Sequence, residues 1–387
     1  VWLASVEEED ITGMTPKGLA SVLWDGFSSV AAISHTGCHI RQLHYVDGRG
    51  GTASALLILN PDMPFLVDSF VMAMRRLRIA SRAVLNAVLS VRRDSEGGLM
   101  HVERAKTGSD PLESYVLCLL AEEISQQEMD TLLSNVSMVA NDAAVVRRDS
   151  VAISTKMQEV ALAKSGDEAQ DVAAFIDWAR NGGFEPFGYA YYRVVPGSEK
   201  LVREAQSCIG LLGEAGHAVY ENCLAGIPED LATLAERSNH LSVVKADVQS
   251  TLHRDQKLDF IGVRDVGTDG AVLGEHCFVG LFSRAAASTP VAQLPFARGR
   301  VKQVLSLAGV RREGFRAEKF LEILESLPRT EAFEAEPEWL AKVCSTVVAL
   351  YKQPRTKVFA RPDVYGRHLN VLVYMPRELY SADLADS

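Results

Sequence analysis

Several features that would reveal a function directly are missing from this sequence of 387 residues. Its six cysteines include no CxxC pair, which excludes a zinc ribbon and a disulfide scaffold and favours a reducing cytoplasm. No apolar run reaches about 18 residues, so no membrane-spanning helix is expected. The 28 glycines and 14 prolines follow no period, and a hydrophobic content of 47% excludes wholesale disorder. We therefore expect two or three globular domains.

The charge balance excludes two classes of partner. The sequence has 40 Lys and Arg against 50 Asp and Glu, a net charge of −10, which argues against binding to nucleic acid or to an anionic membrane. The first residue is Val1 rather than Met, and the acidic residues 7–10 do not fit a signal peptide. We expect the chain to be a piece of a longer cytoplasmic protein.

Common catalytic motifs are absent or incomplete. HExxH, GxSxG and GxxxxGK[ST] do not occur. Gly210, Gly213 and Gly216 are spaced GxxGxxG rather than GxGxxG, which does not support a dinucleotide site. Residues 253–255 (HRD) imitate a kinase catalytic loop, but the asparagine that such a loop needs falls at Phe260. These patterns predict no catalytic residues in this chain.

One short cluster has ligand types that suit a metal. His35, Cys38 and His39 combine imidazole and thiolate groups, which can share one soft cation. A fourth ligand is not evident, although His44 or a distant cysteine could supply it. Ordinary strand and loop sequence is the preferred interpretation, so we predict no metal site.

The first part of the chain predicts an α+β sandwich of ferredoxin-like type. The helix that starts near residue 125 has the capping-box pair Ser125 and Glu128 and a continuous apolar stripe over 129–143. Two amphipathic helices alternate with the strands and cover one face of their sheet. Strands are expected at 38–46, 52–59, 83–92, 99–104 and 112–121, and a first helix at 62–77.

The rest of the chain has a different pattern. A helix near 171–180 precedes strands at 187–195, 241–246, 259–266 and 271–282, which predicts a largely antiparallel sheet. Helical periodicity covers 301–350, and a hairpin of strands 356–360 and 369–374 follows. Because an isolated hairpin is marginally stable and this one has nothing to pack on, we expect it to be the start of a truncated domain.

The junction after the second strand is the strongest candidate for a ligand site. Residues 60–64 (NPDMP) lead from a strand into a helix, whose first N–H groups suit a carboxylate such as that of an amino acid. Asp62 is also well placed to be the N-cap of that helix, and capping is the preferred interpretation.

An ordered series of segments resembles the N-terminal region of the large bacterial NAD-specific glutamate dehydrogenases. The segments are 62–69 (DMPFLVDS), 187–192 (FGYAYY), 250–254 (STLHR), 260–263 (FIGV), 274–275, 280–282, 328–329, Phe333, 365–367 (YGR) and 371–380 (VLVYMPRELY). The family usually has Pro where this chain has Asp255, and an acidic residue where it has Thr330. The resemblance spans most of the chain.

The resemblance implies a division into four parts. It gives an ACT-like domain with an N-terminal extension at 1–150, a PAS-like antiparallel domain at 151–298, a helical connector at 299–352, and the truncated start of a further ACT-like domain at 353–387.

The resemblance also implies a function. The chain is expected to be a non-catalytic regulatory and oligomerisation segment whose partners are its own catalytic domain and other subunits of a homo-oligomer. The catalytic lysine and the NAD site lie outside it. ACT-like domains often bind amino acids, which makes Asn60, Asp62 and Ser69 the expected effector-binding residues. Three alternatives remain: a purely structural module, an amino-acid-sensing regulator of another enzyme, and an independent enzyme.

Overall fold

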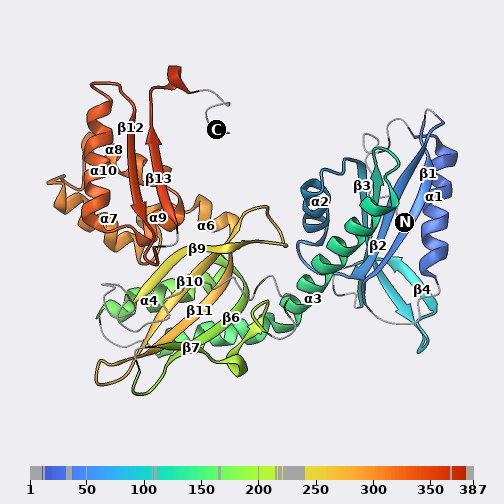
Figure 1. Cartoon of the computed structure of the whole chain (residues 1–387), viewed down its shortest axis with the longest axis horizontal. Helices are drawn as coiled ribbons and strands as arrows, with labels where there is room; N and C mark the ends of the chain where they lie inside the picture. The colour runs from blue at the N-terminus through green and yellow to red at the C-terminus, as the bar shows by residue number, and fades with distance from the viewer. Residues whose placement is uncertain are drawn as a thin grey trace. The chain divides into compact units, whose positions relative to one another are not determined.

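The computed structural model describes residues 11, 14–31, 37–48, 50–106, 108, 111–163, 167–198, 200–213, 216, 220, 240–366 and 368–380 (Figure 1). The chain divides into two compact units. The first unit is Val1–Arg147 with Ser250–Gln256, and the second is Arg148–Gln249 with Lys257–Ser387. The segment Ser250–Gln256 is called the 250–256 turn below.

The first unit contains a five-stranded antiparallel sheet in the order β1-β2-β5-β3-β4. This arrangement confirms the expected α+β class and the expected succession of strands and helices. The elements are α1 (Pro16–Val30), β1 (His39–Val46), β2 (Thr52–Pro61), α2 (Leu66–Arg76), β3 (Ser81–Arg93), β4 (Leu99–Arg104), β5 (Leu112–Leu120) and α3 (Gln126–Leu162), of which the residues after Arg147 belong to the second unit.

Helix α1 is the element that the sequence analysis missed. Thr15 caps it by accepting a hydrogen bond from the backbone N–H of Gly18, and Pro16 occupies its first turn. Leu19 and Val22 of α1 share a core with alternate residues of β2, β3 and β5. The central strands β2 and β5 are buried along nearly their whole length, because the sheet is covered on both faces rather than on one.

The two longer helices of this unit begin in different ways. Ser125 and Glu128 form the expected capping box at α3, and the hydrogen bonds from Ser125 lower the pKa of the Glu128 carboxyl. Helix α2 begins at Leu66, four residues later than expected. Its N-cap is Phe65, which has φ 69° and no side-chain cap, so the expectation that Asp62 caps this helix is wrong.

The second unit is built around an antiparallel sheet in the order β7-β6-β11-β10-β9, with β8 paired to β6. The antiparallel sheet expected here is confirmed. Its elements are α4 (Asp167–Trp178), η3 (Ala179–Gly183), β6 (Phe184–Val194), β7 (Leu201–Arg203), η4 (Ala205–Ser207), β8 (Ile209–Gly210), β9 (Leu241–Gln249), β10 (Lys257–Val266) and β11 (Val272–Phe282).

Helices and a hairpin follow the sheet within the same unit. One continuous core joins them to it, and in this core the ring of Phe333 lies 5.0 Å from that of Phe175 and 5.6 Å from that of Phe282. The elements are α6 (Arg284–Ser288), η6 (Val291–Gln293), α7 (Ala297–Leu307), α8 (Phe315–Ser326), α9 (Arg329–Glu334), α10 (Pro337–Leu350), β12 (Lys357–Pro362), β13 (Leu369–Tyr374) and η7 (Arg377–Leu379).

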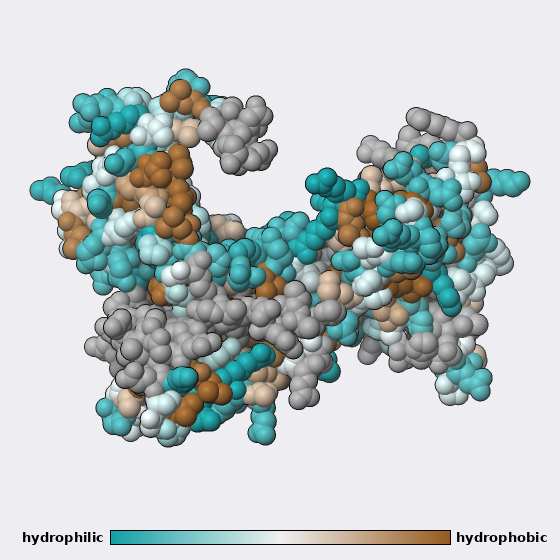
Figure 2. Space-filling model, viewed as in Figure 1, coloured by the Kyte–Doolittle hydropathy of each residue, from teal (hydrophilic) through white to brown (hydrophobic). Residues whose placement is uncertain are grey.

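The hairpin β12–β13 has one packed face and one exposed face. Phe359 belongs to the core of the second unit, and its ring makes an edge contact with Trp339. The expectation that this hairpin has nothing to pack on is therefore wrong. On the opposite face Val358, Val371 and Val373 are each about half exposed, and Figure 2 shows apolar surface over this hairpin.

Gly280 in β11 provides a test of the packing between β11 and β6. A Cβ atom at this position would overlap the backbone oxygen of Glu185, whereas a Cβ at Gly299 would meet only Asp171, at 3.6 Å. We expect Gly280→Ala to lower the free energy of unfolding by about 1–3 kcal/mol, as overpacking does. Gly299→Ala, in a helix, is the control. Urea denaturation followed by circular dichroism measures both, and equal stability of the two variants would contradict the packing described.

Candidate functional site

Two of the expected effector-binding residues lie where β2 ends. Asn60 is buried, and its side-chain amide donates a hydrogen bond to the backbone oxygen of Pro61. Asp62 does not cap α2; its carboxylate accepts a hydrogen bond of 2.5 Å from the hydroxyl of Ser114 in the neighbouring strand β5. Asp62 therefore fixes the end of β2 against β5, and its remaining lone pairs are available to a ligand donor.

Ser69 lies in α2 and is fully buried. Its hydroxyl donates to the backbone oxygen of Phe65 at 2.6 Å and accepts a hydrogen bond of 2.9 Å from the backbone N–H of His253. The rings of Phe65 and His253 lie 4.0 Å apart, and both residues have positive φ angles, 69° and 67°. Two strained residues thus meet at the start of α2, over Ser69.

The 250–256 turn has further contacts with the first unit. The guanidinium of Arg76 in α2 donates to the backbone oxygen of Ser250 at 2.8 Å and to Asp255 at 3.0 Å. The hydroxyl of Thr251 donates to the buried carboxylate of Asp142 in α3 at 2.7 Å. Asp255 thus serves as an acceptor for Arg76. The turn therefore lies against α2 and contacts Ser69, one of the three expected effector-binding residues.

Sequence reasoning missed the role of this turn. Residues 253–255 imitate an incomplete kinase loop, and residues 250–254 also belong to the family resemblance, but neither pattern predicts a contact with α2. Ser69 and His253 are 184 positions apart, so no local pattern could have paired them.

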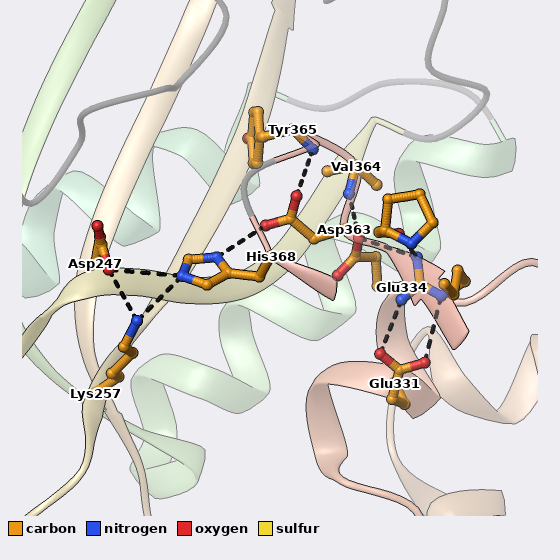
Figure 3. A network of polar contacts seen from close by, with 10 residues as sticks. Asp247, Lys257, Glu331, Glu334, Asp363, Val364, Tyr365 and His368 are labelled. Carbon is orange, nitrogen blue, oxygen red and sulfur yellow. Dashed lines mark hydrogen bonds and ion pairs between the residues drawn. The ribbon is translucent and has the colours of Figure 1, made fainter. Parts of the chain in front are cut away.

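A buried ionic cluster lies in the second unit, between α9 and the hairpin β12–β13 (Figure 3). Arg361 of β12 forms ion pairs of 2.9 Å with Glu331 and 3.3 Å with Glu334, and both glutamate side chains are only 2% exposed. Glu334 also accepts a hydrogen bond of 2.6 Å from the backbone N–H of Val364. Two buried carboxylates thus share one guanidinium, and burial raises the pKa of Glu334 to about 7.

The same hairpin places His368 between two polar groups (Figure 3). Its Nε2 lies 3.1 Å from the ammonium of Lys257, and its Nδ1 lies 3.3 Å from the carboxylate of Asp363. The same Nε2 lies 3.6 Å from the carboxylate of Asp247, which also pairs with Lys257. The network links the hairpin to β10 through polar contacts and has no nucleophile placed beside a base.

The possible metal cluster gains no support from the described residues. Cys38 and His39 lie at the start of β1, whereas His35 lies outside the described residues. Burial raises the pKa of the Cys38 thiol to about 11, which disfavours the thiolate that binds zinc. In the part of the chain that the structure describes, no three His, Cys, Asp or Glu side chains are grouped as metal ligands.

Among the described helices, none combines the length and apolar character needed to cross a bilayer.

Comparison with family models defines the class of protein. The model of the glutamate dehydrogenase ACT1 domain matches residues 1–136, that of glutamate dehydrogenase helical motif 1 matches 294–353, and that of the glutamate dehydrogenase ACT2 domain matches 357–387. The chain is thus a multidomain segment that contains ACT domains. The three models occur in one order and come from one family, and the chain belongs to that family, the glutamate dehydrogenases.

Curated relatives agree with this assignment. The NAD-specific glutamate dehydrogenase of Pseudomonas aeruginosa is 28% identical over 350 residues, which is 87% of this chain and 21% of the relative. The enzymes of the same name from Halomonas elongata and Mycobacterium tuberculosis are 24% and 28% identical, over 87% and 88% of this chain and 22% and 20% of the relatives. The chain spans about a fifth of the length of these relatives, and the resemblance seen in the sequence is confirmed.

A solved structure titled "Structure of an RNA-binding Light-Oxygen-Voltage Receptor" aligns with 73% of this chain and 87% of its own, at 7% identity and a TM-score of 0.15. That score is too low to establish a shared fold.

Proposed function

We propose that this chain is a non-catalytic regulatory and oligomerisation segment of a large NAD-dependent glutamate dehydrogenase in the cytoplasm. The parent enzyme converts L-glutamate, NAD and water into 2-oxoglutarate, ammonium and NADH, with the NAD site outside this chain. The observation that carries the proposal is the order ACT1, helical motif 1, ACT2 in a chain that spans about a fifth of NAD-specific relatives.

The proposal keeps the expected domain division. Residues 1–150 form the first ACT-type domain, 151–298 a PAS-like domain, 299–352 a helical connector, and 353–387 the start of a second ACT-type domain. The antiparallel sheet β7-β6-β11-β10-β9 supports the second of these assignments.

The regulatory role requires an effector site, which we place at Asn60, Asp62 and Ser69. Helix α2 begins without a side-chain cap, so its first N–H groups can receive the carboxylate of an amino acid. The acceptor lone pairs of Asp62 suit the ammonium group. The hydroxyl of Ser69 is held by the backbone N–H of His253, and a bound carboxylate competes for that N–H. Effector binding therefore loosens the 250–256 turn from α2.

We expect a free amino acid to raise the melting temperature of the chain. A ligand that binds only the folded state at 100 times its dissociation constant stabilises it by about 2.7 kcal/mol. Ser69→Ala removes the hydroxyl at the site and should reduce this stabilisation, whereas Ser134→Ala, on an exposed position of α3, should not. Thermal shift with all twenty amino acids at millimolar concentration measures the effect. A melting temperature that none of the twenty amino acids raises counts against the effector site.

A purely structural module is the second candidate. The exposed apolar side chains of Val358, Val371 and Val373 favour it, because exposed apolar patches mark interaction surfaces. This candidate would be favoured over the regulatory role if sedimentation equilibrium showed stable oligomers and no amino acid raised the melting temperature.

A further inference from the structure

A pocket with a volume of about 500 Å³ lies within the second unit. Its walls come from α8, α10, the segment that follows α10, and the end of β13 with η7, and Figure 1 shows these two helices beside the hairpin. The volume falls within the range of about 300–1,000 Å³ that is typical of sites for small organic ligands. The pocket is therefore large enough for a ligand of metabolite size.

Much of the wall of this pocket is apolar. Ile323 of α8 and Val347 of α10 line it, and both belong to the buried core of the second unit. Leu350 extends the apolar surface. The half-buried ring of Tyr374 packs against the same core and makes an edge contact with Phe359, with 6.0 Å between the ring centres. The core fixes most of these side chains, so the pocket offers a preformed surface to the apolar part of a ligand.

Two arginines of the pocket have no partner among the described residues. Arg355, which follows α10, and Arg377, in η7, both line the pocket and are exposed. Neither guanidinium group takes part in a hydrogen bond or an ion pair with the residues that the structure describes. A guanidinium has five N–H donors in a planar fork, and this fork matches the two oxygens of a carboxylate. Both arginines are thus free to bind an anionic group.

Two carboxylates also line the pocket, and one of them is already neutralised. Glu322 forms an ion pair of 2.6 Å with Lys319, which offsets its charge. Glu378 is exposed and follows Arg377 in η7. Two arginines against the single carboxylate of Glu378 leave one unbalanced positive charge at the pocket. This balance favours a ligand that carries one negative charge.

We propose that this pocket binds an organic monocarboxylate, with the carboxylate at Arg355 and Arg377 and an aliphatic or aromatic body against Ile323, Val347 and Tyr374. A cation of the same shape would meet two guanidinium groups of its own sign. A small anion without an apolar body would leave the apolar wall in contact with water. The site does not depend on the regulatory role proposed above or on the junction at Ser69.

The test is ligand-observed NMR, in which saturation is transferred from the 387-residue chain to 4-phenylbutyrate or to one of three analogues. The analogue 4-phenylbutylamine reverses the charge of the head group, 4-phenylbutanol removes the charge, and butyrate lacks the ring. We expect 4-phenylbutyrate to bind with a dissociation constant of about 1–5 mM. Each analogue should bind at least about fivefold more weakly, because each lacks either the negative charge or the apolar body.

Three substitutions locate the binding. Arg355→Gln and Arg377→Gln each remove one guanidinium from an exposed position, so the fold should be kept and 4-phenylbutyrate should bind about fivefold more weakly or worse. Arg311→Gln is the matched control, because Arg311 is also exposed but does not line the pocket. The control should bind 4-phenylbutyrate as the wild type does. Circular dichroism confirms that each variant is folded.

Three results would overturn the proposal: no binding of 4-phenylbutyrate at about 20 mM, equally tight binding of 4-phenylbutylamine, or unchanged binding in both Arg355→Gln and Arg377→Gln. Ser69→Ala separates this pocket from the junction at α2. Binding that survives Ser69→Ala and weakens in Arg377→Gln supports the pocket, whereas the reverse pattern places the carboxylate at the junction and refutes the pocket.

Discussion

Replacement of Arg361 by methionine is expected to lower the free energy of unfolding by about 3–5 kcal/mol. Arg361 is the shared partner of Glu331 and Glu334, whose side chains are almost completely buried. Without the guanidinium, two carboxylates remain close together in a region that excludes water. Each then loses its charge-assisted hydrogen bonds, and the two repel each other. Urea denaturation followed by circular dichroism measures the loss.

The matched control for this substitution is Arg193→Met. Arg193 forms an ion pair of 2.9 Å with Glu204, but both side chains are more than a third exposed. Exposed pairs contribute about 0–1 kcal/mol, so this variant should unfold at nearly the wild-type urea concentration. If Arg361→Met were no less stable than Arg193→Met, the buried cluster would not hold the hairpin as described.

Stability is also expected to depend on pH through Glu334. Burial raises its pKa from 4.5 to about 7, so the folded chain binds a proton that the unfolded chain releases between these values. The contribution of Glu334 to stability is therefore fully present below pH 4.5 and is lost as the pH rises to about 7. At about 1.4 kcal/mol per pH unit the total change is about 3 kcal/mol.

The comparison that isolates this effect is between the wild type and Glu334→Gln. The variant keeps the shape of the side chain and has no proton to exchange, so the contributions of other groups cancel in the difference. We expect the wild type to lose about 2–3 kcal/mol relative to the variant between pH 5 and pH 8, measured by urea denaturation. A difference that stays constant over this range would show that Glu334 does not titrate there.

Local signals in the sequence predicted much of the fold. The capping box of Ser125 and Glu128 set the start of α3, and hydrophobic periodicity located the longer strands of both sheets but not the short strands β7 and β8. Helix α1 was missed, although Thr15 followed by Pro16 is a readable start signal for a helix. Without α1, the predicted first domain has no helix on one face of its sheet.

The contacts at the candidate sites could not be predicted because they join distant segments. Asp62 is the example nearest in sequence: its place beside Ser114 depends on the register of β2 against β5, and 52 positions separate the two residues. The contact of Ser69 with His253 spans 184 positions. Single-sequence patterns describe neighbours along a helix or strand, so they located the junction at α2 but not the turn that lies over it.

The central claim is that this chain is a non-catalytic segment of a glutamate dehydrogenase, and an absorbance assay tests it most directly. The purified 387-residue chain is incubated with L-glutamate and NAD, and NADH formation is followed by its absorbance, with an active glutamate dehydrogenase as the positive control. The account predicts no increase above a reaction without protein. NADH formation that requires both this chain and L-glutamate would contradict it.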